Sequence, residues 1–151
     1  MGKFTDGFMD GTNDVVTFAT AKKLKEKGYD RPCLLHYDIM GNLQWNNILV
    51  DHGFDTVSVA EGLTDYNSFH FTCIDAPATS QVMKWLREEV SVHVETFATS
   101  FGYGFIISRT PDKGGTDLYH SRYEGPNDGG AWDRPEDAEA AALDYVIDNL
   151  I

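Results

Sequence analysis

Two short stretches carry the residues best suited to metal chemistry. CLLH at residues 33–36 and HFTC at residues 70–73 place both cysteines and two of the five histidines in a Cys-x2-His … His-x2-Cys arrangement. Zinc binds two thiolate sulfurs and two imidazole nitrogens in a tetrahedron, so the composition of this set fits the metal. The four residues of this alternative zinc site are Cys33, His36, His70 and Cys73.

The spacing within each stretch argues against zinc. Ligands three residues apart can converge on one ion in a helix or a tight knuckle turn, but in a strand they point to opposite faces. The intervening residues, Leu34-Leu35 and Phe71-Thr72, include no glycine or proline that would build such a turn. A buried free cysteine behaves as a small apolar residue. We therefore expect ordinary strand residues here and no cofactor.

Signatures of catalysis are missing from the sequence. No G-x-S-x-G elbow surrounds a nucleophilic serine. His93 and His120 fall in adjacent predicted strands, where pairing across the sheet explains them without a reaction. Acidic pairs such as Glu88-Glu89 are typical of a helix surface. We expect a protein that is not an enzyme.

Aromatic residues supply the candidate binding surface. FGYGF at residues 101–105 lacks the third glycine of a phosphate-binding loop and does not open a helix. In a strand, Phe101, Tyr103 and Phe105 share one face, and two glycines share the other. If helices cover the glycine face, the aromatic face is core, a protein interface or a stacking platform, and core is the usual outcome. Trp132 is either a plug beneath the last helix or an exposed anchor, and completes the four candidate binding residues.

The charge balance limits the class of partner. The chain of 151 residues has 24 acidic and 12 basic residues, a formal net charge of −12. Phosphate backbones would be repelled, and the counterion release that drives nucleic-acid binding would be small. The exception is a run of lysines, which we interpret as a solvated helix face. Its members are Lys22, Lys23, Lys25 and Lys27.

The first half of the chain predicts one helix and several strands. Thr17 can cap a helix over 17–27, and Gly28 is placed to end it. The pair Gly41-Asn42 predicts a hairpin turn between two strand-like runs. The remaining segments are expected to be strands at 33–40, 43–50 and 68–74, and a polar surface segment at 51–68.

The second half has clearer signals. Asp75 is a candidate cap for a helix over 75–90, with Pro77 in its first turn. Three strand-like runs follow, at 91–99, 103–110 and 116–124. Asp133 and Glu136 have the spacing of a capping box at the start of the closing helix.

These elements predict one α+β domain over 15–151, after a flexible N-terminal segment over 1–14. We expect a mainly antiparallel sheet with helices packed on it, and α-β-β-β-α order in the C-terminal half. No apolar run approaches the ~20 residues of a membrane helix, and no secretory signal is visible. We therefore expect a cytoplasmic protein with no membrane partner.

Three segments of the sequence, LKEKGYDRPC, APATSQVMKWLREE and RPEDAEAAALDYVIDNLI, resemble a family of small, mostly uncharacterised bacterial and bacteriophage proteins. That family has an LKExGF-like helix, a central AP…WLREE helix and a C-terminal EAxxAAxxYxIxxL helix. The resemblance covers about half the chain, least over 41–68, and implies a bacterial or phage setting with no established activity. It is carried by Ala21, Leu24, Lys25, Gly28, Tyr29, Ala76, Pro77, Gln81, Trp85, Leu86, Arg87, Glu88, Ala138, Ala141, Ala142, Tyr145 and Leu150.

The α-β-β-β-α order also resembles that of double-stranded-RNA-binding domains, whose last helix is likewise rich in alanine. Such domains need basic residues at the start of that helix to hold phosphates, and this chain has DRPEDAE there. The topology is similar, but the acidic residues at the start of the last helix are unfavourable for binding RNA.

The expected function is that of a small acidic protein-binding or accessory module, with another protein or a second copy of the chain (a homodimer) as its partner. Two alternatives stay open. One is a zinc-binding protein that uses the four ligands named above. The other is a nucleic-acid binder that uses the aromatic sheet face.

Overall fold

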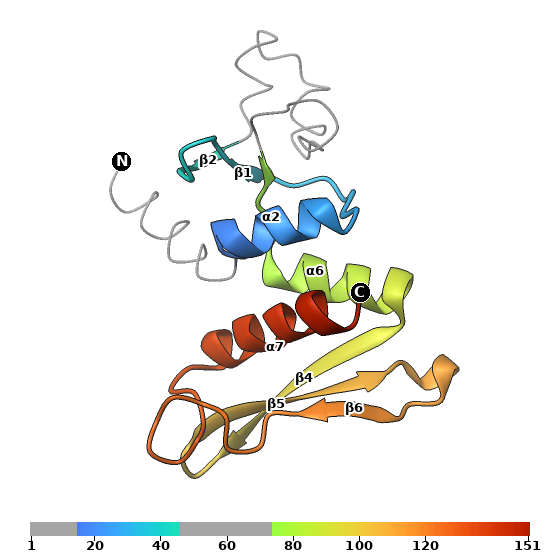
Figure 1. The fold of residues 1–151 in the computed structure, drawn as a ribbon, viewed down its shortest axis with the longest axis vertical. Helices are drawn as coiled ribbons and strands as arrows, with labels where there is room; N and C mark the ends of the chain where they lie inside the picture. The colour runs from blue at the N-terminus through green and yellow to red at the C-terminus, as the bar shows by residue number, and fades with distance from the viewer. Residues whose placement is uncertain (1–14, 46–73) are drawn as a thin grey trace, which may run out of the picture. The chain divides into compact units, whose positions relative to one another are not determined.

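A computed structural model describes residues 15–45 and 74–151. The chain divides into two compact units, Met1–Gln81 and Val82–Ile151, and each is described by itself (Figure 1). The fold is α+β, with helices and two three-stranded antiparallel sheets, as the sequence predicts. The single domain over 15–151 stays a prediction, and the segment 1–14 lies outside the described residues.

The first unit contains helix α2, Phe18–Glu26, and a sheet in the order β2-β1-β3. The Thr17 hydroxyl accepts the N–H of Thr20 at 3.2 Å, and Gly28 takes a left-handed φ of 85° beyond the helix end. Both helix signals in the sequence are therefore confirmed. The strands are β1, Leu35–Tyr37, β2, Leu43–Trp45, and β3, Ile74–Asp75.

The hairpin between β1 and β2 has a longer connection than the sequence predicts. The Asp38 carboxylate accepts the backbone N–H groups of Met40 and Asn42, each at 2.9 Å, and so ends β1 after three residues. These hydrogen bonds also lower the pKa of Asp38. The predicted strand over 33–40 is thus too long, and most of the expected structure over 43–74 falls on residues 46–73, outside the described part.

The predicted cap of the middle helix is wrong. Asp75 lies in β3 opposite His36 and is 1% exposed. Helix α6, Thr79–Trp85, begins four residues later, where the Gln81 side chain accepts the N–H of Ala78 at 2.9 Å. A π-helical turn, η2, Leu86–Val90, follows it and ends at Ser91 with a left-handed φ of 60°.

The second unit is a sheet covered on one face by a helix. Strands β4, Val92–Thr99, β5, Gly102–Arg109, and β6, Asp117–His120, lie in that order, with the short helix η3, Pro111–Lys113, between the last two. Helix α7, Pro135–Asn149, packs on β4 and β5 (Figure 1). The α-β-β-β-α order is confirmed. The core of this layer contains Val92, Val94, Phe105, Ile107, Ala138, Ala142, Leu143, Val146 and Ile147.

The capping box predicted for α7 is not formed. Arg134 occupies the N-cap position without a side-chain cap, and its guanidinium lies 3.5 Å from Glu136. The Asp133 carboxylate instead accepts a hydrogen bond from Asn127 at 3.0 Å. None of the helices in the described ranges is both long and apolar enough to cross a membrane.

Candidate binding site on the C-terminal unit

Helix α7 covers the aromatic face of β5, not the glycine face. The register pairs Phe105 with Thr96, and Phe105 is 2% exposed, with its ring centroid 5.9 Å from that of Tyr119 and 5.5 Å from that of Trp132. A helix can approach either face of a strand that alternates glycine and aromatic residues, so alternation alone does not decide between them. Phe105 therefore belongs to the core.

The other three candidate binding residues lie in different environments. Tyr103 and Trp132 are half-buried, and their backbones pair through hydrogen bonds of 2.8 and 2.9 Å. The ring of Trp132 packs against that of Phe105, so part of its side chain is covered. Phe101, at the turn between β4 and β5, is 64% exposed. Of the four, Phe101 is the one most accessible to a partner.

Tyr119 and Tyr145 join β6 to α7. Their rings stack with centroids 3.8 Å apart and an interplanar angle of 17°. The Tyr119 hydroxyl donates to the Glu124 carboxylate. This hydrogen bond, with burial and the charge of Glu124, raises the pKa of Tyr119 to about 12. Tyr119 thus fixes where the chain leaves β6 and enters the next loop.

The opposite face of the sheet is open and hollowed near the end of β6. Phe97 lies over Gly104, where a Cβ atom would come within 2.7 Å of the Phe97 ring. A hollow of about 480 Å³ is lined by Phe97, Thr99, His120, Arg122 and Tyr123. A second hollow of about 410 Å³ lies between Phe101, Tyr123 and the loop 125–130.

The two hollows share Tyr123, which is 86% exposed. An exposed tyrosine of this kind, next to an exposed phenylalanine, differs from the scattered apolar residues found on any protein surface. We call the residues Phe97, Phe101, His120, Arg122 and Tyr123 the Tyr123 site.

Two polar side chains, those of His120 and Arg122, supply hydrogen-bond donors to this site. His120 accepts the backbone N–H of Arg122 at Nδ1, 2.8 Å away, so its proton sits on Nε2 and can be donated. Arg122 has a left-handed φ of 47°, which is uncommon for a residue with a side chain. Among residues 15–45 and 74–151 its guanidinium forms no ion pair. The hollow therefore offers two hydrogen-bond donors beside aromatic rings.

Asn127 holds the loop that forms the second hollow. Its Oδ1 atom accepts the N–H groups of Gly129 and Ala131, and its Nδ2 atom donates to the Phe101 carbonyl and to Asp133. Gly129 is packed so closely that a Cβ atom there would lie 2.2 Å from the Cβ of Phe101. The loop is thus fixed against the β4–β5 turn before any partner arrives.

Most of this site was not predicted from the sequence. His93 and His120 were expected on adjacent strands, but β5 separates β4 from β6, so this pairing is wrong. Arg122 and Tyr123 follow β6 in a loop rather than extending it as the predicted strand over 116–124 requires. The available signal was an arginine and a tyrosine shortly before a loop rich in glycine.

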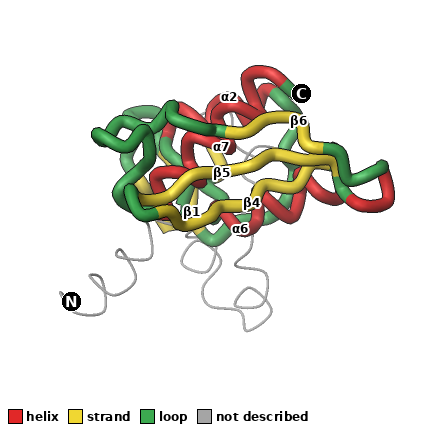
Figure 2. Tube along the Cα trace, turned by 90° about the horizontal axis from the view of Figure 1, so that it is seen from below, coloured by secondary structure: helices red, strands yellow, loops and turns green. Residues whose placement is uncertain are grey.

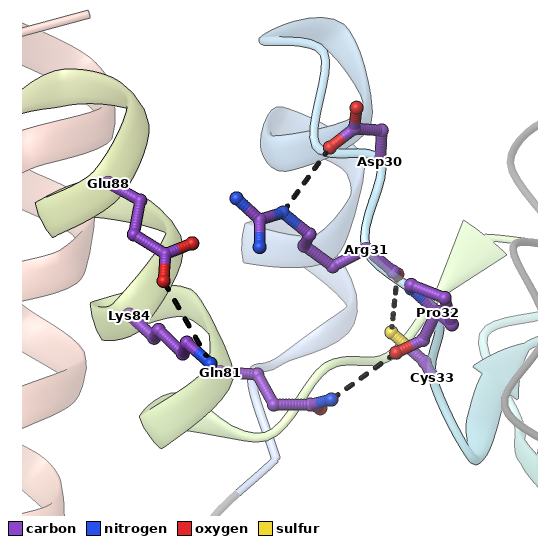
Figure 3. A network of polar contacts seen from close by, with 7 residues as sticks. All are labelled: Asp30, Arg31, Pro32, Cys33, Gln81, Lys84 and Glu88. Atoms are coloured by element: carbon purple, nitrogen blue, oxygen red, sulfur yellow. Dashed lines mark hydrogen bonds and ion pairs between the residues drawn. The ribbon is translucent and has the colours of Figure 1, made fainter.

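The alternative zinc site is tested only in part. Cys33 is buried, and its thiol donates to the Arg31 carbonyl at 3.4 Å, while Gln81 donates to the Pro32 carbonyl at 3.3 Å (Figure 3). His36 is also buried, within β1. No group of three or more potential metal-binding side chains occurs in the described part of the chain. His70 and Cys73 lie outside it, so the four-ligand site stays a hypothesis.

Comparison of the chain with protein-family models, with curated proteins and with solved structures gives no match. The resemblance to small bacterial and phage proteins therefore stays a prediction.

Proposed function

We propose that the protein is a non-enzymatic binding module that holds a segment of another protein on the Tyr123 site. The observation that carries this proposal is the exposure of Tyr123, which lines both hollows, and of Phe101, which lines the second. Tyrosine and phenylalanine supply large contact areas at a small cost in side-chain entropy, and aromatic residues are enriched at protein interfaces.

The rigidity of the site supports binding. Asn127 and the close packing of Gly129 fix the loop against Phe101. A surface that is already ordered loses little conformational entropy when a partner docks, so more of the contact energy appears as affinity.

The chemistry of the site favours a segment that combines an apolar side chain with a carboxylate. The rings of Phe97 and Tyr123 would cover the apolar group, while Arg122 and the Nε2–H of His120 would bind the carboxylate. The net charge of −12 favours a partner that is basic outside this segment, because opposite charges steer association. The proposal keeps the expected cytoplasmic location and bacterial or phage setting.

A photo-crosslinking experiment tests this function. A benzophenone amino acid replaces Tyr123 in one variant and Lys113, an exposed residue of η3 in the same unit, in the control. We expect the Tyr123 position to give a discrete protein adduct in host lysate and the Lys113 position to give none. The purified partner should then bind the Tyr123→Ala protein at least ~30-fold more weakly, as expected for a central aromatic contact.

Three results would contradict the proposal. The first is equal cross-linking from both positions, and the second is an affinity that Tyr123→Ala does not change. The third is an adduct that ribonuclease removes, which would favour the nucleic-acid alternative instead.

A further inference from the structure

The turn between β1 and β2 presents two exposed aliphatic side chains (Figure 1). Ile39 is 72% exposed and Met40 is 79% exposed, more than any other large aliphatic side chain in the described ranges. Exposed apolar residues scattered singly are ordinary, but two adjacent ones on a turn form a continuous apolar surface. We call residues 38–40 the Met40 tip.

The Met40 tip has a fixed shape. The Asp38 carboxylate accepts the N–H groups of Met40 and Asn42, and the Gly41 N–H donates to the Asp38 carbonyl at 3.0 Å. Gly41 has a left-handed φ of 83° and lies against Phe18, where a Cβ atom would come within 2.9 Å of the ring. A turn held in this way loses little conformational entropy when it docks.

Asp38 places a negative charge beside the two aliphatic side chains. The hydrogen bond from the Asn42 N–H is the main cause of the lowered pKa of Asp38, so the carboxylate is ionised at neutral pH. Its Oδ2 atom accepts one hydrogen bond within the described ranges, from Gln44 at 3.3 Å, and a carboxylate oxygen can accept two. The tip therefore combines an apolar group with a carboxylate that can accept a further donor.

This is the combination that suits the Tyr123 site. Figure 2 looks onto the sheet face that α7 leaves uncovered, with β5 between β4 and β6. The hollow on this face has walls formed by Phe97 and Tyr123, and its donors are Arg122 and the Nε2–H of His120. Methionine sulfur packs favourably against aromatic rings, and guanidinium–carboxylate hydrogen bonds are stronger than neutral ones.

We propose that the Met40 tip of a second copy of this chain occupies the Tyr123 site when no partner is bound. This inference rests on the proposed function, because the tip and the partner segment use the same hollow and the same donors. In the contact Met40 lies against Phe97 and Tyr123, and Asp38 binds Arg122. A partner must displace the tip, so its apparent affinity falls as more of the sites are occupied by tips.

The charge of the whole chain limits the strength of this contact. Two chains of net charge −12 repel one another at long range. At physiological ionic strength the screening length is about 8 Å, so exposed charges farther apart than this interact weakly, whereas Asp38 and Arg122 in contact are well inside it. We therefore expect weak, reversible self-association.

Two variants that each lack one half of the contact test the inference. Ile39→Ser/Met40→Ser removes the apolar part of the tip and keeps the site, whereas Tyr123→Ala alters the site and keeps the tip. In sedimentation equilibrium on the full chain, each variant alone should self-associate at least ~30-fold more weakly than the wild type. An equimolar mixture of the two should form a heterodimer and nothing larger, because it has one intact contact.

Further variants supply controls for this experiment. The replaced side chains are exposed, so circular-dichroism spectra should be unchanged. Leu34→Ser is the matched control, because Leu34 is an aliphatic residue, 47% exposed, outside the tip, and its replacement should leave self-association unchanged. Arg122→Gln, added to the variant without the tip, should weaken the heterodimer about tenfold, because it removes the charged donor.

The outcomes separate this inference from the proposed function. A wild-type chain that is monomeric at all concentrations overturns the inference, and so does a mixture that does not associate or a self-association that either variant retains. A complex that holds the heterodimer and the purified partner together overturns mutual exclusion. If Tyr123 cross-links to a host protein while the chain stays monomeric, the proposed function stands and this inference alone fails. If the mixture associates but no host protein is cross-linked, the self-contact stands and the proposed function fails.

Discussion

Asn127 determines the shape of the Tyr123 site, and its replacement by alanine tests that reasoning. The side chain takes part in four hydrogen bonds of 2.8 to 3.1 Å. Each contributes about 0.5–1.5 kcal/mol net, less where water can substitute. The Ala131 amide is buried, and an unsatisfied buried amide costs about 1–3 kcal/mol. We expect Asn127→Ala to lower the free energy of unfolding by about 2–4 kcal/mol.

Urea unfolding followed by circular dichroism measures this loss. Asn149→Ala is the matched control, because Asn149 makes one exposed side-chain hydrogen bond, to the Tyr145 carbonyl, and should cost less than about 0.5 kcal/mol. Asn127→Asp keeps the acceptor oxygens but loses both donors and faces Asp133, so it should also be destabilised. If Asn127→Ala costs no more than Asn149→Ala, the side chain of Asn127 does not hold the loop.

Three further perturbations have definite expected outcomes. Thr17→Ala removes a helix cap and should cost about 0.5–2 kcal/mol in urea unfolding, most of which Thr17→Ser should recover. Because the pKa of Tyr119 is raised from 10.0 to about 12 by its hydrogen bond to Glu124, its stabilisation is complete below pH 10 and is lost as the pH rises to 12. Tyr119→Phe should therefore flatten the alkaline decline of the unfolding free energy, and an unchanged slope would refute the assignment. Gly129→Ala should cost about 1–3 kcal/mol, because the new Cβ displaces Phe101; a neutral effect would show that the two are not in contact.

Local signals in the sequence predict the fold where the decisive contacts are local. Thr17 and Gly28 set both ends of α2, because a cap and a left-handed glycine act within one turn of the helix. Asp75 failed as a helix cap because it pairs with His36, 39 positions earlier in the chain, and its carboxyl is buried in β3. The residues adjacent to Asp75 in the sequence do not indicate that it pairs with His36.

Contacts that local sequence signals do not specify also explain why the role of Asp133 and the Tyr123 site were not predicted. Asp133 has good capping-box spacing, but Asn127 binds its carboxylate. The site itself combines Phe97 from β4, His120 from β6, and Tyr123 from the following loop. Their proximity depends on the register of three strands, which alternation of side chains does not determine.

The two outer sides of the C-terminal sheet differ in a way that limits how far assembly can proceed. Beyond β6 the chain's own loop bonds to β5, through the Ser121 amide to the Phe105 carbonyl at 3.0 Å and through Trp132. β6 has only four residues, whereas β4 has eight, so the two outer strands of the sheet differ in length. Fibril growth requires each subunit to add neighbours on two flanks. The short β6 strand offers few backbone groups to a neighbour on its flank, so lateral polymerisation through this sheet is disfavoured.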